Sequence, residues 1–337
     1  MNAMYSLVLV FALVLIPIFG VGGANLKSIF GICVPATALT IFLIGFVYKI
    51  LKWGRSAVPF RIPTTGGQQQ SFDWIKQNKW DNPSTGPQTV IRMILEVFAF
   101  RSLFRNTKAS VNEGPVVAYA SAKWLWLFAI LFHYAFFLIL VRHMRLFLQP
   151  IPFVIEAVDF LDSLMQVGIP RMYISDILIL LGVGFLLLRR LIDAKVRYIS
   201  LAADYFPLFL ILAIALSGIY MRYFAKVDVV AIKELTLGLL TLHPKIPASV
   251  DVSFFVHLFL VSVLLAYFPF SKLMHLGGVF LSPTRNMPND SRMVHHVNPW
   301  NDPSIKAHSY EAYEDEFRAP MAEAGLPLEK PLEAKAE

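Results

Sequence analysis

The chain contains a single cysteine, Cys33, which lies inside an apolar segment. One cysteine cannot form an intrachain disulfide. It also cannot supply a four-cysteine iron–sulfur cluster or the C-x-x-C-H attachment of a covalently bound haem, so these groups are excluded. We interpret Cys33 as a small, buried apolar side chain.

Charge is scarce as well. Only 16% of the 337 residues are charged, whereas a soluble domain of this length carries about 25%. Hydrophobic residues make up 56% of the chain, and its mean hydropathy is +0.59. The net charge of +7 does not indicate nucleic-acid binding, because the basic residues lie in loops between apolar segments, as membrane orientation requires. We therefore expect a polytopic membrane protein without a nucleic-acid partner.

The apolar segments predict an all-α polytopic membrane protein with a six-helix transmembrane bundle. The expected spans are 4–22, 29–51, 121–146, 174–192, 204–224 and 252–281. No basic region precedes the first segment, so we expect a retained helix rather than a cleaved signal peptide. The expected regions are a two-helix membrane segment at 1–51, a cytoplasmic loop with an amphipathic helix at 52–120, a membrane core at 121–281 and a cytoplasmic tail at 282–337.

Loop charge predicts the orientation in the cytoplasmic (inner) membrane. Twenty-one basic residues fall on one side of the six spans and eight on the other. Because basic loops stay in the cytoplasm, the richer side is inner and both termini are cytoplasmic.

Two loop segments show helical spacing of apolar residues. The inner stretch 89–104 predicts a basic amphipathic helix that lies on the membrane face or docks a partner subunit. An outer segment in 147–170 carries Glu156, Asp159 and Asp162 on one side. The tail after Ser282 is polar, and we expect it to order only against a partner.

Two of the spans each contain two histidines: His133 with His143, and His257 with His275. A neutral imidazole in lipid costs free energy unless its nitrogens are bonded, so an intramembrane histidine is a functional candidate. In a helix the first pair differs in height by about 15 Å and the second by about 27 Å. Eighteen residues are five full turns, whereas ten residues leave two side chains about 80° apart.

These two spans run in opposite directions. His133 and His275 therefore lie near the inner side, and His143 and His257 near the outer side. The unequal rises require tilt and side-chain reach, with a kink at Pro269. The matched depths predict two haems, each bound by two histidines.

Two alternative roles for these histidines stay open. An intramembrane histidine often forms a helix-to-helix hydrogen bond. Zinc is less favoured, because cysteine and carboxylate partners are missing nearby. The remaining histidines lie in loops or the tail and are expected to be solvated or to face a partner: His243, His295, His296 and His308.

The run FVHLFLVSVLLAYFPFSKLMHLGGVF resembles the last membrane helix of the gamma subunits of respiratory nitrate reductases. The shared features are H-x17-H and F-P-F-S-[KR]-L-x-H, and the other helix matches that family's H-x9-H. The resemblance covers about 120–285. It implies two b-type haems, one on His133 and His275 and the other on His143 and His257.

Three features depart from that family: the extra N-terminal span, the long basic inner loop and the tail SPTRNMPNDSRMVHHVNPWN. They resemble the DsrM branch, the membrane cytochromes of sulfite-reductase-associated DsrMKJOP complexes. This resemblance implies menaquinol oxidation and a cytoplasmic iron–sulfur partner resembling a heterodisulfide reductase subunit. It also implies further membrane and extracytoplasmic subunits. A family member that serves a nitrate or heterodisulfide reductase is the alternative.

Bis-histidine ligation leaves no open iron site for oxygen chemistry, so such haems relay single electrons. The membrane quinone pool is the expected donor. Because quinol oxidation releases protons, we expect the quinol site near the outer haem. The polar residues expected there are Arg142, Arg171, Tyr173 and Asp176. Such residues also anchor helices at membrane interfaces.

On the inner side, we expect the loop, the helix at 89–104 and the tail at 282–303 to dock the iron–sulfur subunit. The tail offers Asn286, Asn289, His295, His296 and Trp300. The competing classes are a transporter or channel with histidine proton relays and a haem-free membrane anchor. A red protein with b-type absorbance bands distinguishes the cytochrome from both.

Overall fold

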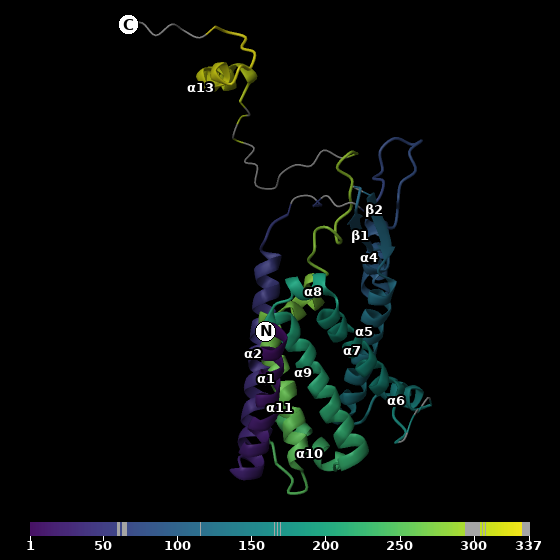
Figure 1. Ribbon diagram of the computed structural model, residues 1–337. Helices are drawn as coiled ribbons and strands as arrows, with labels where there is room; N and C mark the ends of the chain where they lie inside the picture. Colours follow the sequence, from purple (N-terminus) through teal and green to yellow (C-terminus); the bar gives the residue numbers. More distant parts are fainter. Residues whose placement is uncertain are drawn as a thin grey trace.

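Long helices lie side by side in the computed structural model, with shorter elements at both ends (Figure 1). The structure describes residues 1–58, 61–62, 66–114, 116–164, 166, 168, 170–293, 304, 306 and 308–331. Five of its helices are long and apolar enough to cross a membrane: Asn2–Gly23, Ile29–Gly54, Lys123–Leu146, Ala202–Ala225 and Val252–Phe270. The chain is thus an all-α polytopic membrane protein, as predicted.

The fourth predicted span is present as α7 (Ile174–Ile192), with the predicted bounds. It is less apolar than those five helices, because it carries three charged residues: Asp176 near one end, and Arg189 and Arg190 near the other. α7 packs along α5 (Lys123–His143). A Cβ on Gly182 would lie 2.8 Å from the Cα of Phe132, so only glycine allows this approach.

The N-terminal pair consists of α1 (Asn2–Pro17), which continues to Gly23, and α2 (Val34–Gly54), which is preceded by Ile29–Cys33. α1 packs against α9 (Ala202–Ile219) and α11 (Val252–Tyr267). Burial of apolar side chains holds the three helices together. Their shared core contains Val10, Leu210, Val256 and Leu260.

Short elements lie at the two ends of the bundle (Figure 1). The end that is expected to be outer carries α6 (Phe153–Ser163) and α10 (Val229–Leu240). α6 is the amphipathic segment predicted in 147–170. The opposite end carries α8 (Ala194–Ile199), α4 (Arg101–Phe104) and a hairpin of β1 (Thr107–Asn112) and β2 (Val116–Ser121). The hairpin is antiparallel, with Thr107 opposite Ser121, and was not expected from the sequence.

The last membrane segment is not one helix to residue 281. α11 ends at Tyr267, a 3-10 turn covers Phe268–Phe270, and Ser271 is extended (φ −117°, ψ 175°). A second turn over Lys272–Met274 leads into α12 (His275–Gly278). Pro269 lacks an N–H and breaks the helix rather than kinking it. The expected helical phase between His257 and His275 therefore does not hold.

The inner loop folds around α3 (Gly86–Ala99). Phe100 adopts a left-handed conformation (φ 50°, ψ 45°) that ends α3 before α4. The polar side of α3 faces inward, because Thr89 and Arg92 are buried while Val90 and Phe98 are exposed. An apolar face is thus available to lipid or a partner.

The tail packs on this loop. Arg285 Nε pairs with Glu96 at 3.0 Å, and the Asn289 side chain donates to Asn82 at 2.6 Å. The expectation that the tail orders only against a partner is wrong for residues 282–293. Beyond them, α13 (Tyr310–Glu323) is a polar helix that was not predicted from the sequence.

Candidate functional site

The structure brings the four membrane histidines together in two pairs. The ring centroids of His133 and His275 are 5.9 Å apart, with the ring planes at 82°. Those of His143 and His257 are 6.4 Å apart, with the planes at 16°. The pairs join α5 to the segment α11–α12, which is the combination expected from opposite helix directions. The broken helix after Tyr267 is what carries His275 to the level of His133.

The Nδ1 atoms of three histidines face main-chain carbonyls. His133 Nδ1 lies 2.7 Å from Ala129 O, and His143 Nδ1 lies 2.7 Å from Ile139 O. His275 Nδ1 lies 2.9 Å from Lys272 O. A carbonyl only accepts, so Nδ1 carries the proton in each ring and Nε2 has a free lone pair.

His257 reaches the same state through a side chain. Its Nδ1 lies 2.9 Å from Ser217 Oγ, and that hydroxyl donates to Ile214 O at 2.9 Å. The serine proton is thereby committed, so its oxygen accepts from His257. The neighbouring Gly218 leaves room for the ring, since a Cβ there would lie 3.2 Å from His257 Cε1.

The pairs fit a haem iron. An imidazole nitrogen lies about 2 Å from the metal it binds, so two rings on opposite faces of one iron have centroids roughly 6 Å apart. Both measured separations agree with this value. Among the described residues, none of the four Nε2 atoms has a hydrogen-bond partner. Carbonyl and serine partners on the other ring nitrogen are the outer contacts that orient metal-binding histidines.

A buried ion-pair cluster lies beside the outer pair, and we call it the outer cluster. Arg142, the neighbour of His143, is 5% exposed. Its Nε donates to Asp159 at 3.1 Å, and its Nη1 donates to Asp162 at 2.6 Å. The cluster contains three arginines and three aspartates: Arg142, Arg145, Arg222, Asp159, Asp162 and Asp176. Its charges balance within the chain.

Tyr173 is held between two guanidinium groups. The Arg142 and Arg222 Cζ atoms lie 3.9 and 4.0 Å from its ring centroid. Next to this stack, the Tyr223 hydroxyl donates to Asp176 at 2.6 Å and accepts the main-chain N–H of Tyr173 at 2.9 Å. The arrangement provides a carboxylate and a phenol in direct hydrogen-bond contact, which is a pair that can accept and pass on a proton.

Three of the four residues expected at a quinol site thus meet: Arg142, Tyr173 and Asp176. Arg171 is exposed, and no described contact joins it to the cluster. Sequence reasoning missed Tyr223 and Arg222, which lie near the end of another span. The acidic face predicted on 147–170 was the available signal for Asp159 and Asp162.

Aromatic rings surround the inner pair. Phe100 and Phe132 each lie 5.0 Å from the His133 ring, edge to face. Two side chains of α5 fix the turn that carries Phe100. Trp126 Nε1 donates to Ala99 O at 2.8 Å, and Tyr134 donates to Phe98 O at 2.9 Å. The end of α3 therefore lies at the level of the inner pair.

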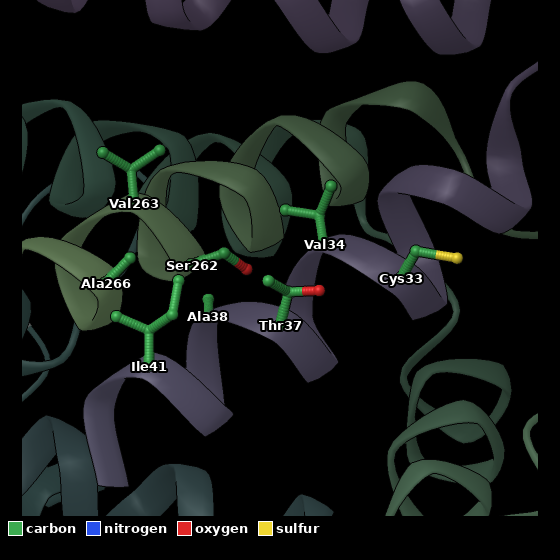
Figure 2. Close-up of a pocket in the computed structure, with 8 residues that line it drawn as sticks. All are labelled: Cys33, Val34, Thr37, Ala38, Ile41, Ser262, Val263 and Ala266. Carbon is green, nitrogen blue, oxygen red and sulfur yellow. The ribbon is translucent and has the colours of Figure 1, made fainter. Parts of the chain in front are cut away.

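An apolar groove of about 280 Å³ lies between α2 and α11 (Figure 2). Cys33 lines one end of it and is exposed, so the expectation of a buried side chain is wrong. The groove contains none of the four paired histidines.

The other histidines lie away from both pairs. His243 and His308 are exposed, as expected. His295, His296 and Trp300 lie outside the described residues. Asn286 donates to Phe280 O at 2.8 Å and Asn289 contacts the loop, so these two side chains serve the tail's own packing.

Comparisons with known proteins place the chain in a family. The model of the nitrate reductase gamma subunit family matches residues 94–289. An Hdr-like menaquinol oxidoreductase cytochrome b-like subunit of Archaeoglobus fulgidus is 49% identical over 284 residues, covering 82% of this chain and 85% of the relative. The subunit of the same name from Archaeoglobus profundus is 41% identical over 274 residues, covering 79% and 81%.

A third relative is more distant. The E subunit of the dihydromethanophenazine:CoB–CoM heterodisulfide reductase of Methanosarcina barkeri is 25% identical over 253 residues, covering 74% of this chain and 88% of the relative.

Proposed function

The chain belongs to the nitrate reductase gamma subunit family, and we propose that it is a dihaem cytochrome b subunit that oxidises menaquinol and delivers the electrons to a cytoplasmic iron–sulfur partner. The observation that carries the proposal is the two histidine pairs, with Nε2 free in each ring. His133 and His275 would hold one haem, and His143 and His257 the other. Bound haem supplies a one-electron relay between the two sides of the membrane.

The chain's own residues orient the four ligands and shield one of them. Each of the four imidazoles has one Nδ1 contact, which fixes the ring in the tautomer that can bind iron through Nε2. The rings of Phe100 and Phe132 shield His133. With no open iron position, the pairs suit electron transfer rather than oxygen activation.

The quinol site in this proposal adjoins the outer cluster. Asp176 accepts a proton from the quinol, and Tyr223, which donates a hydrogen bond to it at 2.6 Å, holds the carboxylate in position. Arg142 holds the aspartates in place, and the same guanidinium group stacks on Tyr173. Arg171 lies just before Tyr173 in the chain. This position is the only observation that supports a role for Arg171 at the quinol site. The names of two relatives favour menaquinol as the donor.

The iron–sulfur partner docks on the inner loop and tail in this proposal, with both termini cytoplasmic. Phe72 and Trp74 stack at 5.8 Å there, and Trp74 is 80% exposed. Exposed aromatic pairs of this kind are the anchors that dominate protein interfaces. The names of the relatives favour a partner of heterodisulfide reductase type. Within the family, the basic loop and tail favour the DsrM branch and dissimilatory sulfur metabolism.

The test is the absorbance of the purified protein. We expect a red protein with two b-type haems per chain. A menaquinol analogue should reduce these haems, and stopped-flow absorbance follows the reduction. Dithionite serves as the control for full reduction. A colourless protein contradicts the cytochrome and favours the transporter or the membrane anchor.

A further inference from the structure

A second cluster of charges, which we call the inner cluster, joins the inner loop to the tail. It contains five arginines and two carboxylates: Arg61, Arg92, Arg101, Arg105, Arg285, Asp81 and Glu96. Asp81 is shared by Arg92, Arg101 and Arg105, and Glu96 by Arg92 and Arg285. Among the described residues, the cluster keeps an excess of three positive charges.

Arg61 is the member with the fewest anionic contacts. It is 5% exposed, its Nε donates to Thr284 O at 3.1 Å, and its Nη1 donates to Asn82 Oδ1 at 3.1 Å. Neither acceptor is a carboxylate, and Nη2 is buried with no hydrogen-bond partner among the described residues. Burial, and then the charge of Arg92, hold the pKa of Arg61 below its ordinary value. A buried cation without a counter-charge costs free energy.

Arg92 differs in that it pairs with Asp81 and Glu96, but it also keeps an unused donor. It is 7% exposed, and its Nε is buried without a partner among the described residues. Its Nη2 donates to Ser102 at 2.9 Å. Two buried guanidinium groups thus each keep one unused donor, and such donors match a carboxylate or phosphate oxygen.

The inner cluster adjoins the inner histidine pair. Arg101 and Ser102 directly follow Phe100, whose ring lies 5.0 Å from that of His133. On the other side, Thr284 and Arg285 lie shortly after His275 in the chain. A cofactor held between these histidines would therefore lie beside the segments that carry the inner cluster.

We propose that Arg61 and Arg92 bind the propionate carboxylates of the haem that His133 and His275 hold. The inference rests on the proposed dihaem function. Haem carries two such carboxylates, which would compensate most of the excess charge. A carboxylate of a docked partner is a poorer match, because both guanidinium groups are covered by the chain's own loop and tail.

The test is a potentiometric titration of both haems in the full-length protein. Reduction adds an electron, so a nearby cation favours the reduced form. Arg61→Met should lower the ratio of reduced to oxidised inner haem about tenfold at a fixed ambient potential, a shift of about 59 mV for one electron. The outer haem should not change. The inner haem is identified as the one that His133→Ala removes.

Three further variants complete the test. Arg61→Lys keeps the charge and should restore most of the ratio. Arg61→Gln keeps donors toward Thr284 and Asn82 without the charge, and serves if the methionine variant folds poorly. Lys79→Met removes an exposed charge from the same loop and should leave both haems unchanged.

The titration separates this inference from the proposed function. Wild-type potentials in both neutral Arg61 variants would overturn the propionate site. An equal shift caused by Lys79→Met would also overturn it, since overall charge would then suffice. A wild-type protein without haem would instead overturn the proposed function.

Discussion

The two ends of the membrane core handle charge in opposite ways. At the outer end, two arginines pair with three aspartates and a third arginine stacks on Tyr173, so the charges balance inside the chain. At the inner end, five arginines share two carboxylates, and two buried guanidinium groups keep unused donors. A balanced cluster suits residues that position a substrate and exchange a proton. An unbalanced one calls for an anion from outside the polypeptide.

The largest effect expected at the outer end comes from Asp176→Asn. Asparagine keeps an acceptor for Tyr223 but loses the basic carboxylate, so reduction by a menaquinol analogue should slow by about 10²–10⁴-fold. Stopped-flow absorbance measures this rate, and dithionite reduction and both spectra should stay normal.

Lys245→Met is the matched control, since it removes an exposed charge on the same side. Wild-type quinol kinetics in the Asp176 variant would move the site away from the outer cluster, most directly to the inner pair.

The second effect concerns how the ligands are oriented. Ser217→Ala removes the acceptor of His257 Nδ1, whereas the other three histidines use main-chain carbonyls. Loss of such a contact lowers metal affinity by about 10–100-fold, so the outer haem should dissociate more readily while the inner haem stays. Ser262→Ala removes a hydroxyl bonded to Leu258 O and should change neither. Equal loss of both haems in the Ser217 variant would argue for a general packing defect.

The third effect is on the partner. Trp74→Ala should weaken binding of the iron–sulfur subunit by more than about 1 kcal/mol, roughly fivefold or more in Kd. Phe153→Ala removes an equally exposed aromatic ring at the outer end and should leave binding unchanged. Titration calorimetry with the purified partner compares the two variants. Equal affinities would remove the inner loop from the interface.

The smallest effect is on stability. Asp251 is the N-cap residue of α11, and its side chain accepts the N–H of Ser253 at 2.8 Å. That hydrogen bond holds the pKa of Asp251 below its ordinary value. Its contribution is therefore present above about pH 3.9, and is lost as pH falls through the lowered pKa. Asp251→Ala should cost about 1 kcal/mol at neutral pH.

Thermal unfolding in detergent measures the loss. Asp251→Asn should keep the cap without this pH dependence. An alanine variant as stable as the wild type at neutral pH would contradict the capping contribution.

The features that could be predicted from the sequence are those that depend on residues close together in the chain. Apolar length predicted the spans, and histidines in lipid drew attention to four residues that the structure brings together in two pairs. The acidic face of 147–170 was visible for the same reason, since charge next to an apolar run is a local pattern. Their role as haem ligands stays a prediction.

Contacts between distant segments could not be predicted. Arg285 and Glu96 are 189 residues apart in sequence, and Ser217 and His257 are 40 apart. The sequence alone does not distinguish Ser217 from the other serines, because its contact with His257 becomes apparent only in the folded structure. The break at Ser271 also depends on tertiary packing, because Gly45 of α2 admits the buried Pro269.

The most direct test of the account is the haem content of four single variants, with low-temperature absorbance to identify the haem that remains. His143→Ala and His257→Ala should lose the same haem, and His133→Ala and His275→Ala should lose the other. The two remaining spectra should be complementary. Loss of the same haem in the His133 and His143 variants, or full haem content in any of the four, would contradict the paired sites.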